Sequence, residues 1–548
     1  MLTWSLNKLS FKHLFKNKKD NYFSNKDVNP NLQKNKEQDA KVNGIIMYII
    51  LFLGYFVFIM SWSGTLYVQG VNTPFDPRSQ GFLISSVNAI HPATNNGIQS
   101  GFNSGLIYQI FPNGVSLTLS RATNWSITMG RGVGAIFFGW LISKINHKYV
   151  VMVAFGFMVA SFPYLFTPFA IHYDRNGNVL NGNAVYGMFI LFRILLAFGG
   201  STMISCANGV IGTYYRKKIS VFASLNVFSV NTASAVVSIF LLSPIITLAI
   251  GLNWQIFNGV IQIAILLLLL IYAYYGKKID LTTKIIKAEL DWSHKNFRQE
   301  SQNAFVVILH HKETYFFLLA ALFLSYITVE PSSNILVNFW TYSPNNINDR
   351  ANLSWVFGAF NIAFLGGVFT GFFTVAKWQK THYSLTRFTS LMFFCGTLFV
   401  AFGVAIGYHG LDAVHIIFLL IFTFLGSTML FGVRGNFYSI PYRWGFTRRQ
   451  STALISLMFG FSYGGYTILD VITSSVMDAG IKAIQNSYPN EITVGAGAGA
   501  IPAVALMFLF PLIAVFAIAF IPREQTATKF SFKDFYNCYL KKFRTESN

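Results

Sequence analysis

The chain has 548 residues, of which 53% are apolar and only 11% are charged, and its mean hydropathy is +0.47. A soluble domain carries about 25% charged residues, so this composition excludes an ordinary water-soluble globular protein. The 41 Lys and Arg residues outnumber the 20 Asp and Glu residues, which gives a formal net charge of +21. Such a balance would suggest nucleic-acid binding in a soluble protein, but here the positions of the charges favour another explanation.

Apolar segments long enough to cross a membrane occur twelve times along the chain. A hydrocarbon core about 30 Å thick needs about 20 helical residues, and the first apolar run is too long for a cleavable signal peptide. The predicted fold is therefore an all-α integral membrane protein with twelve transmembrane helices. These cover residues 43–69, 118–143, 149–171, 185–214, 219–243, 250–275, 313–340, 351–376, 384–408, 412–440, 451–477 and 499–521.

The spans divide into two groups of six on either side of a long polar loop. In chain order we expect a basic tail (1–42), a first six-helix bundle (43–275) containing a long outer loop (70–117), an inter-bundle loop (276–312), a second six-helix bundle (313–521) and a second tail (522–548).

The basic residues concentrate on one side of the predicted membrane. Most of the 41 Lys and Arg residues fall in the tails, in 276–312 and in every second short loop. Outer loops hold only Arg78, Arg175, Arg350 and Lys482. By the positive-inside rule we expect a multi-pass cell-membrane protein with both termini and 276–312 cytoplasmic and 70–117 external. The basicity is thus topological, and we expect no nucleic-acid partner.

Three segments carry family-like motifs. The turn from Gly139 to Lys148 resembles the G-x-x-x-D-R/K-x-G-R-R/K signature of the major facilitator superfamily, with Gly139, Lys144 and Lys148 matching and Ser143 in place of the acid. Arg193 and the glycines after it, and the segment from 440 to 453, resemble two further motifs of that superfamily. The resemblance covers residues 43–521 and implies a major facilitator fold, in which Gly139, Lys144 and Lys148 form a cytoplasmic gate motif.

A short internal match supports a duplicated architecture. Gly200-Ser201-Thr202-Met203 in the fourth span reappears as Gly426-Ser427-Thr428-Met429 in the tenth. If the two halves are repeats, Gly200 and Gly426 should occupy equivalent places in the two bundles.

Few ionisable residues lie inside the predicted spans. A charge at the bilayer centre costs at least about 2.5–3.5 kcal/mol, so each such residue must face a partner or an aqueous cavity. Arginine suits bidentate capture of phosphate or carboxylate. We therefore predict substrate binding by Arg131, Arg434 and Arg193; the alternative is that these arginines pair with acidic groups or carbonyls and lock helices together. Arg121 is expected at the outer end of the second span.

Two acidic residues are predicted to couple transport to a proton. Glu330 precedes Pro331, whose ring removes one backbone hydrogen bond, and Asp470 lies in the eleventh span. Each could carry a coupling proton or form a salt bridge with an arginine. The aromatic residues Trp62, Tyr67, Tyr463 and Tyr466 could line a sugar or base site, although packing is the interpretation we favour.

The resemblance implies a secondary transporter that works by alternating access. No ATP-binding loop, zinc-protease motif or nucleophile elbow occurs, and the three cysteines form no metal or redox motif. We expect a monomeric non-enzyme without a cofactor. It moves a small organic anion, with a proton or phosphate as the possible coupling partner. Sugar-phosphate:phosphate antiporters suit paired interior arginines, although they use an arginine on the first helix and residues 43–69 hold no charge.

Two alternatives remain open at this point. One is a proton-coupled transporter of a neutral solute such as a sugar, nucleoside, peptide or drug, in which Glu330 or Asp470 would matter more than the arginines. The other is a non-transporting membrane sensor or scaffold, for which the long loop 70–117 is the only hint.

Overall fold

The computed structural model describes most of the predicted spans and few of the long loops. Apart from isolated positions, the described residues are 30–63, 117–144, 147–175, 179–214, 254–275, 312–329, 343–346, 353–375, 385–437, 448–487 and 492–520. The chain divides into two compact units, Met1–Asn43 and Gly44–Asn548. In the first unit, residues 30–43 are helical.

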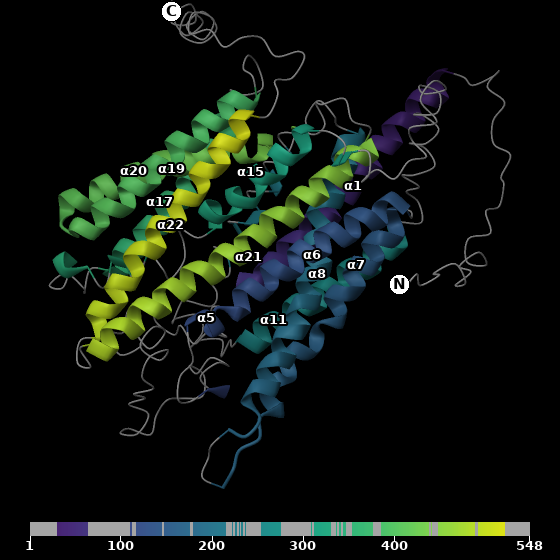
Figure 1. Ribbon diagram of the computed structural model, residues 1–548. Coiled ribbons are helices and arrows are strands. Elements are labelled where there is room, and N and C mark those ends of the chain that lie inside the picture. The colour runs from purple at the N-terminus through teal and green to yellow at the C-terminus, as the bar shows by residue number, and fades with distance from the viewer. Residues whose placement is uncertain are drawn as a thin grey trace, which may run out of the picture. The chain divides into compact units, whose positions relative to one another are not determined.

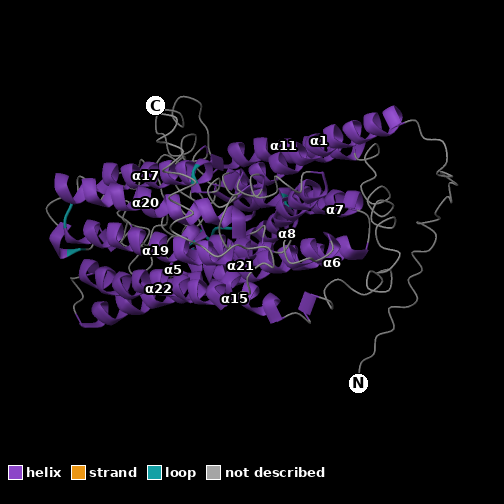
Figure 2. Ribbon diagram, turned by 90° about the horizontal axis from the view of Figure 1, so that it is seen from above, coloured by secondary structure: helices purple, strands orange, loops and turns teal. Residues whose placement is uncertain are grey.

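The elements labelled in Figure 2 are all helices. The first half contributes α1 (Pro30–Ser63), α5 (Leu117–Ser120), α6 (Ala122–Lys144), α7 (His147–Ala160), the 3-10 helix η4 (Phe162–Ala170), α8 (Gly182–Tyr214) and α11 (Trp254–Tyr275). The second half contributes α15 (Lys312–Val329), the 3-10 turn η7 (Pro344–Asn346), α17 (Leu353–Phe373), α19 (Leu385–His409), α20 (Ala413–Phe437), α21 (Arg448–Ser487) and α22 (Ile492–Phe520).

The described helices match the predicted spans closely. Eight of them are long and apolar enough to cross a membrane, by length and composition. Eleven of the twelve predicted spans overlap a described helix. Most of the predicted span 219–243 and most of residues 330–338 lie outside the described residues, as do loops 70–109 and 276–307. The surface also carries large exposed apolar side chains, such as Phe169, Ile362 and Phe516, which a bilayer would cover.

Helix packing forms two groups that meet along one long helix. In the first half α8 packs against α6 and α7, and in the second half α20 packs against α17 and α19. Helix α21 contacts α15 and α22 of its own half, and it also runs along α6 and α8 of the first half (Figure 1). Residues more than 300 positions apart in the sequence therefore meet where α6 and α21 lie together.

Glycine pairs allow equivalent close approaches in the two halves. A Cβ built on Gly130 would lie 2.9 Å from the Ile194 carbonyl oxygen of α8, and one on Gly134 would overlap the Phe198 backbone. In the second half, Gly367 and Gly371 of α17 face the backbone of α20 in the same way. Small residues four positions apart let helices approach closely where lipid removes the hydrophobic driving force. The α6–α8 and α17–α20 pairs are thus structural counterparts.

The repeat register predicted from the four-residue match is wrong. Gly200 of α8 faces the ring of Phe58 on α1, whereas Gly426 of α20 faces Gly396 and Val400 on α19. If α8 and α20 are counterparts, α1 corresponds to α15 and not to α19, so the two glycines lie on different faces. Small residues recur wherever apolar helices approach closely, so short identical strings arise at unrelated positions.

Candidate functional site

Arg131 lies at the contact between the two halves. It belongs to α6, and its side chain is only 1% exposed. Its Nη2 donates a hydrogen bond to the hydroxyl of Tyr55 at 2.6 Å and another to the hydroxyl of Tyr463. Because Tyr55 belongs to α1 and Tyr463 to α21, one guanidinium bridges the first and second halves.

Aromatic rings surround the same guanidinium. Its carbon lies 3.6 Å from the ring centroid of Tyr463, 4.7 Å from Trp62 and 5.4 Å from Phe58. Tyr55, Phe58 and Trp62 recur at helical spacing, which places all three on one face of α1. Rings over a cation contribute about 2 kcal/mol or more when water is excluded. In the part of the chain that the structure describes, no carboxylate is within ion-pair distance of Arg131, and its Nε has no hydrogen-bond partner.

Arg193 has a different environment, although it is equally buried. Its Nη1 donates to the Ser61 carbonyl oxygen at 2.9 Å, and its Nη2 donates to that of Trp62 at 3.3 Å. These carbonyls belong to the last turn of α1, where the helix leaves acceptors unsatisfied and favours a positive charge. Arg193 therefore fastens α8 to the end of α1, which is the structural alternative considered for it.

Arg434 lies in the last turn of α20 and is 5% exposed. Its guanidinium carbon is 5.7 Å from the ring of Phe431 on the same helix. It is also within electrostatic range of the Tyr463 phenol, which contacts Arg131 directly. Arg131 and Arg434, from different halves, thus both act electrostatically on Tyr463, and a direct contact with it is seen for Arg131.

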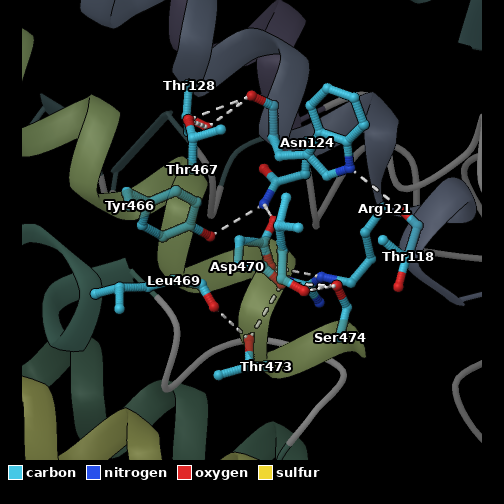
Figure 3. Close-up of polar contacts among 12 residues, drawn as sticks. Thr118, Arg121, Asn124, Thr128, Tyr466, Thr467, Leu469, Asp470, Thr473 and Ser474 are labelled. Atoms are coloured by element: carbon cyan, nitrogen blue, oxygen red, sulfur yellow. Dashed lines mark hydrogen bonds and ion pairs between the residues drawn. The ribbon is translucent and has the colours of Figure 1, made fainter. Parts of the chain in front are cut away.

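Asp470 forms a buried ion pair with Arg121. The Nε of Arg121 is 2.7 Å from Oδ1 of Asp470, and its Nη2 contacts the same oxygen. Asn124 donates to the other carboxylate oxygen at 3.1 Å (Figure 3). Asp470 is completely buried and Arg121 is 5% exposed. The sequence identified Asp470 as a candidate but assigned no role to Arg121.

These contacts form part of a continuous polar strip between α5–α6 and α21, which we call the α6–α21 seam. The two helices run antiparallel, because residues later in α6 contact residues earlier in α21. Its contacts are Thr118 with Asp478, Arg121 and Asn124 with Asp470, Asn124 with Tyr466, Thr128 with Thr467, and Arg131 with Tyr463.

A sequence signal for this seam existed but was missed. Arg121, Asn124, Thr128 and Arg131 recur every three or four residues, so they share one face of a helix. The polar residues of α21 recur with the same spacing. The polar faces of α6 and α21 are not evident from the composition of either helix, because apolar or small residues separate each polar residue from the next.

The remaining predicted residues lie away from this cluster or outside the description. Gly139 is buried on α6, Lys144 is the last residue of α6, and Lys148 is in the first turn of α7. The Nζ of Lys148 is 5.7 Å from the ring of Tyr149. Glu330 and Tyr67 lie outside the described residues.

Comparisons with known proteins agree on one family. The sequence profile of the family described as Mycoplasma MFS transporter matches residues 189–478. A "Major facilitator superfamily transporter" from Mycoplasma pneumoniae is 23% identical over 541 residues, covering 87% of this chain and 93% of that protein. A similar transporter from Mycoplasma genitalium is 21% identical and covers 88% of this chain and 91% of its own length.

Solved structures show the same fold. The proton:xylose symporter XylE, bound to 6-bromo-6-deoxy-D-glucose, aligns with a TM-score of 0.55 over 89% of this chain and 98% of its own. A bacterial homologue of the iron transporter ferroportin aligns with a TM-score of 0.51 over 86% and 99%. Their sequence identities are 13% and 12%, so the likeness concerns the fold alone.

Proposed function

The chain belongs to the Mycoplasma MFS transporter family, and from that premise we propose that it carries a small organic anion across the membrane by alternating access. Membership establishes a multi-pass membrane transporter with the major facilitator fold. The proposal adds the charge of the substrate, the residues that bind it and the orientation of the chain, with both termini cytoplasmic as the positive-inside rule predicts.

The environment of Arg131 is the observation that supports an anionic substrate. Burying a guanidinium is costly unless it is paired, and the described neighbours of Arg131 offer only phenols and ring faces. A carboxylate or phosphate of the substrate would supply the missing counter-charge and could use the planar fork of arginine. Because Arg131 contacts both α1 and α21, an anion bound there would interact differently with each conformation, as alternating access requires.

The other candidates receive distinct roles in this proposal. Arg434 is the second binding residue, because it acts electrostatically on Tyr463 as Arg131 does. Arg193 is a structural anchor, because its nitrogens bond backbone carbonyls of α1. Glu330 stays the proposed coupling residue, and Gly139, Lys144 and Lys148 stay the proposed cytoplasmic gate motif.

A neutral sugar is the second candidate substrate. Ring faces and hydroxyl groups suit sugar binding, and Trp62, Tyr55 and Tyr463 present both around one position. In that case Arg131 would act as a hydrogen-bond donor to sugar hydroxyls, and transport would be coupled to a proton through an acidic residue.

Uptake by proteoliposomes separates the two substrates. Purified protein is screened with radiolabelled sugar phosphates, short carboxylates and neutral sugars, with and without a proton gradient. The anion proposal predicts uptake of a phosphorylated or carboxylated compound. It also predicts a loss of about tenfold or more in Arg131→Lys and Arg131→Gln, because one hydrogen bond to a charged group contributes about 1.5–3 kcal/mol.

Arg193→Lys is the matched control, because it makes the same change at another buried arginine. Uptake per folded molecule should survive in this variant. Uptake of a neutral sugar that persists in Arg131→Lys but is abolished in Glu330→Gln would replace the anion proposal with the neutral-solute one.

A further inference from the structure

The polar seam between α6 and α21 presents a problem for a transporter. Alternating access requires the two halves to separate on one side of the membrane and then on the other. The seam joins the halves from Thr118 and Asp478 at one end to Arg131 and Tyr463 in the interior. It therefore has to open once in each cycle, and its strongest contact is the buried ion pair between Arg121 and Asp470.

The buried ion pair is suited to opening and closing. Removing two charges from water is costly, and their mutual attraction in the protein repays much of that cost. When the seam opens, Arg121 and Asp470 exchange each other for water, so the pair favours the closed state only moderately and the seam can still open. An apolar contact of the same area would lack this compensation, because its exposure to water is uniformly unfavourable.

Asn124 connects this ion pair to the Arg131 site. Its Oδ1 accepts a hydrogen bond from Nε1 of Trp62 at 3.0 Å, and the indole ring of Trp62 lies over the guanidinium of Arg131. Its Nδ2 donates to the Tyr466 hydroxyl at 3.0 Å and to Oδ2 of Asp470 at 3.1 Å. Figure 3 shows Asn124 pointing into the space between Tyr466 and Asp470. One side chain thus joins α1, α6 and α21.

We propose that Asn124 is a positioning residue that couples the Arg131 site to an ion-pair latch, Arg121–Asp470, which closes the α6–α21 seam and opens during transport. When an anion reaches Arg131, Trp62 moves, and its hydrogen bond to Asn124 breaks or forms. This change shifts the Asn124 side chain and so weakens or strengthens its hydrogen bond to Asp470. Asp470 is accordingly a latch residue and not the proton carrier. The proposal rests on transport by alternating access, but it does not depend on which compound is carried.

Disulfide crosslinking measures the state of the latch without any substrate. Thr118 and Ser475 face each other across the outer part of the seam, with their hydroxyl oxygens 3.4 Å apart. Both are changed to cysteine in a chain in which Cys206, Cys395 and Cys538 are replaced by alanine. The rate of disulfide formation in proteoliposomes, with copper phenanthroline as oxidant, then reports the closed fraction. Closure by the disulfide should stop uptake, and reduction should restore it.

Two variants weaken the latch, and a third serves as the control. Asn124→Asp keeps an acceptor for Trp62 but places a carboxylate against Asp470, and Arg121→Gln/Asp470→Asn removes both charges together. We expect crosslinking to slow by about tenfold in each, as the loss of a charge-assisted hydrogen bond predicts. Thr128→Val removes the 2.7 Å contact with Thr467 in the same seam but no charge, so it should slow the rate by about threefold at most. Crosslinking at the wild-type rate in both weakened variants would overturn the latch.

Trp62→Phe tests the coupling itself. The ring over Arg131 is kept while the donor to Asn124 is lost, so crosslinking should slow by about threefold, as the loss of one neutral hydrogen bond predicts. In an uptake assay the variants of Asn124 should lower the maximal rate, whereas Arg131→Lys should raise the half-saturating concentration. An unchanged crosslinking rate in Trp62→Phe would refute the coupling role of Asn124. Failure to find any transported anion would refute the proposed substrate and leave the crosslinking result unaffected.

Discussion

Arg131 and Arg193 are both fully buried arginines of the first half, but their surroundings differ. Arg193 donates to two backbone carbonyls at the end of α1, which are fixed by the helix. Arg131 donates to two phenols from different halves, which side-chain rotation or helix movement can withdraw. Among the residues that the structure describes, the Nε of neither arginine has a hydrogen-bond partner. Burial of a charge therefore does not by itself separate a binding role from a structural one, and the two arginines differ in the kind of partner that holds the charge.

The largest effect on stability is expected at the buried ion pair, where one charge is compensated by an opposite charge. Arg121→Gln leaves Asp470 buried without its cation, which should lower the free energy of unfolding by about 3–5 kcal/mol. Arg121→Gln/Asp470→Asn removes both charges and should recover most of that loss. Thermal unfolding of the purified protein in detergent measures both. Equal losses in the single and double variants would show that the ion pair contributes little to stability.

Arg193 and Arg131 should respond in opposite ways to the same change. Arg193→Met removes two hydrogen bonds to α1 and should destabilise the protein by about 1.5–3 kcal/mol, with uptake per folded molecule retained. Arg131→Met removes a buried charge that no described carboxylate compensates, so stability should be kept or increased while uptake is lost. Unfolding and uptake measured on the same preparations check this, and a severe loss of stability in Arg131→Met would make Arg131 a structural residue as well.

The glycine pairs allow the two halves to be compared directly. Gly134→Ala and Gly371→Ala each place a methyl group against the backbone of the neighbouring helix and should destabilise by about 1–3 kcal/mol. Gly156→Ala is the control, because a Cβ there would meet no atom of the described residues within 4 Å. Thermal unfolding again provides the measurement. A large effect in only one half would argue against equivalent packing.

The smallest effect is expected at the hydroxyl groups around Arg131. Tyr463→Phe removes one hydrogen-bond acceptor of the Arg131 guanidinium but keeps the ring face over it. The free energy of unfolding should therefore fall by only about 0.5–1.5 kcal/mol. Uptake should fall severalfold at most. Phe459→Leu, one turn away on α21, is the control for ring packing. A loss as great as that of Arg131→Lys would mean that the Tyr463 hydroxyl binds the substrate itself.

Sequence alone was sufficient for the membrane fold and for most of the helices. Length, apolar runs and family-like motifs predicted an all-α major facilitator fold, and the family match and the structural likeness confirm it. These features are local, since each span must satisfy its own backbone hydrogen bonds in lipid. Helix ends were less accurate: α21 begins at Arg448 and ends at Ser487, well beyond the predicted 451–477. Hydropathy detects only the part of a helix that lies in the bilayer.

What each charge contacts was decided only by the tertiary structure. The sequence presented Arg131, Arg193 and Arg434 as similar candidates and gave Arg121 no role, because nothing local distinguishes a guanidinium over rings from one on carbonyls. The partner of Asp470 lies 349 residues away, in the turn just before α6, a helix that meets α21 only after both halves have packed. The repeat register failed for the same reason, since Gly200 and Gly426 share neighbours in sequence but not in space. Periodicity fixes which residues share a helix face, and only the packing of helices determines which faces meet.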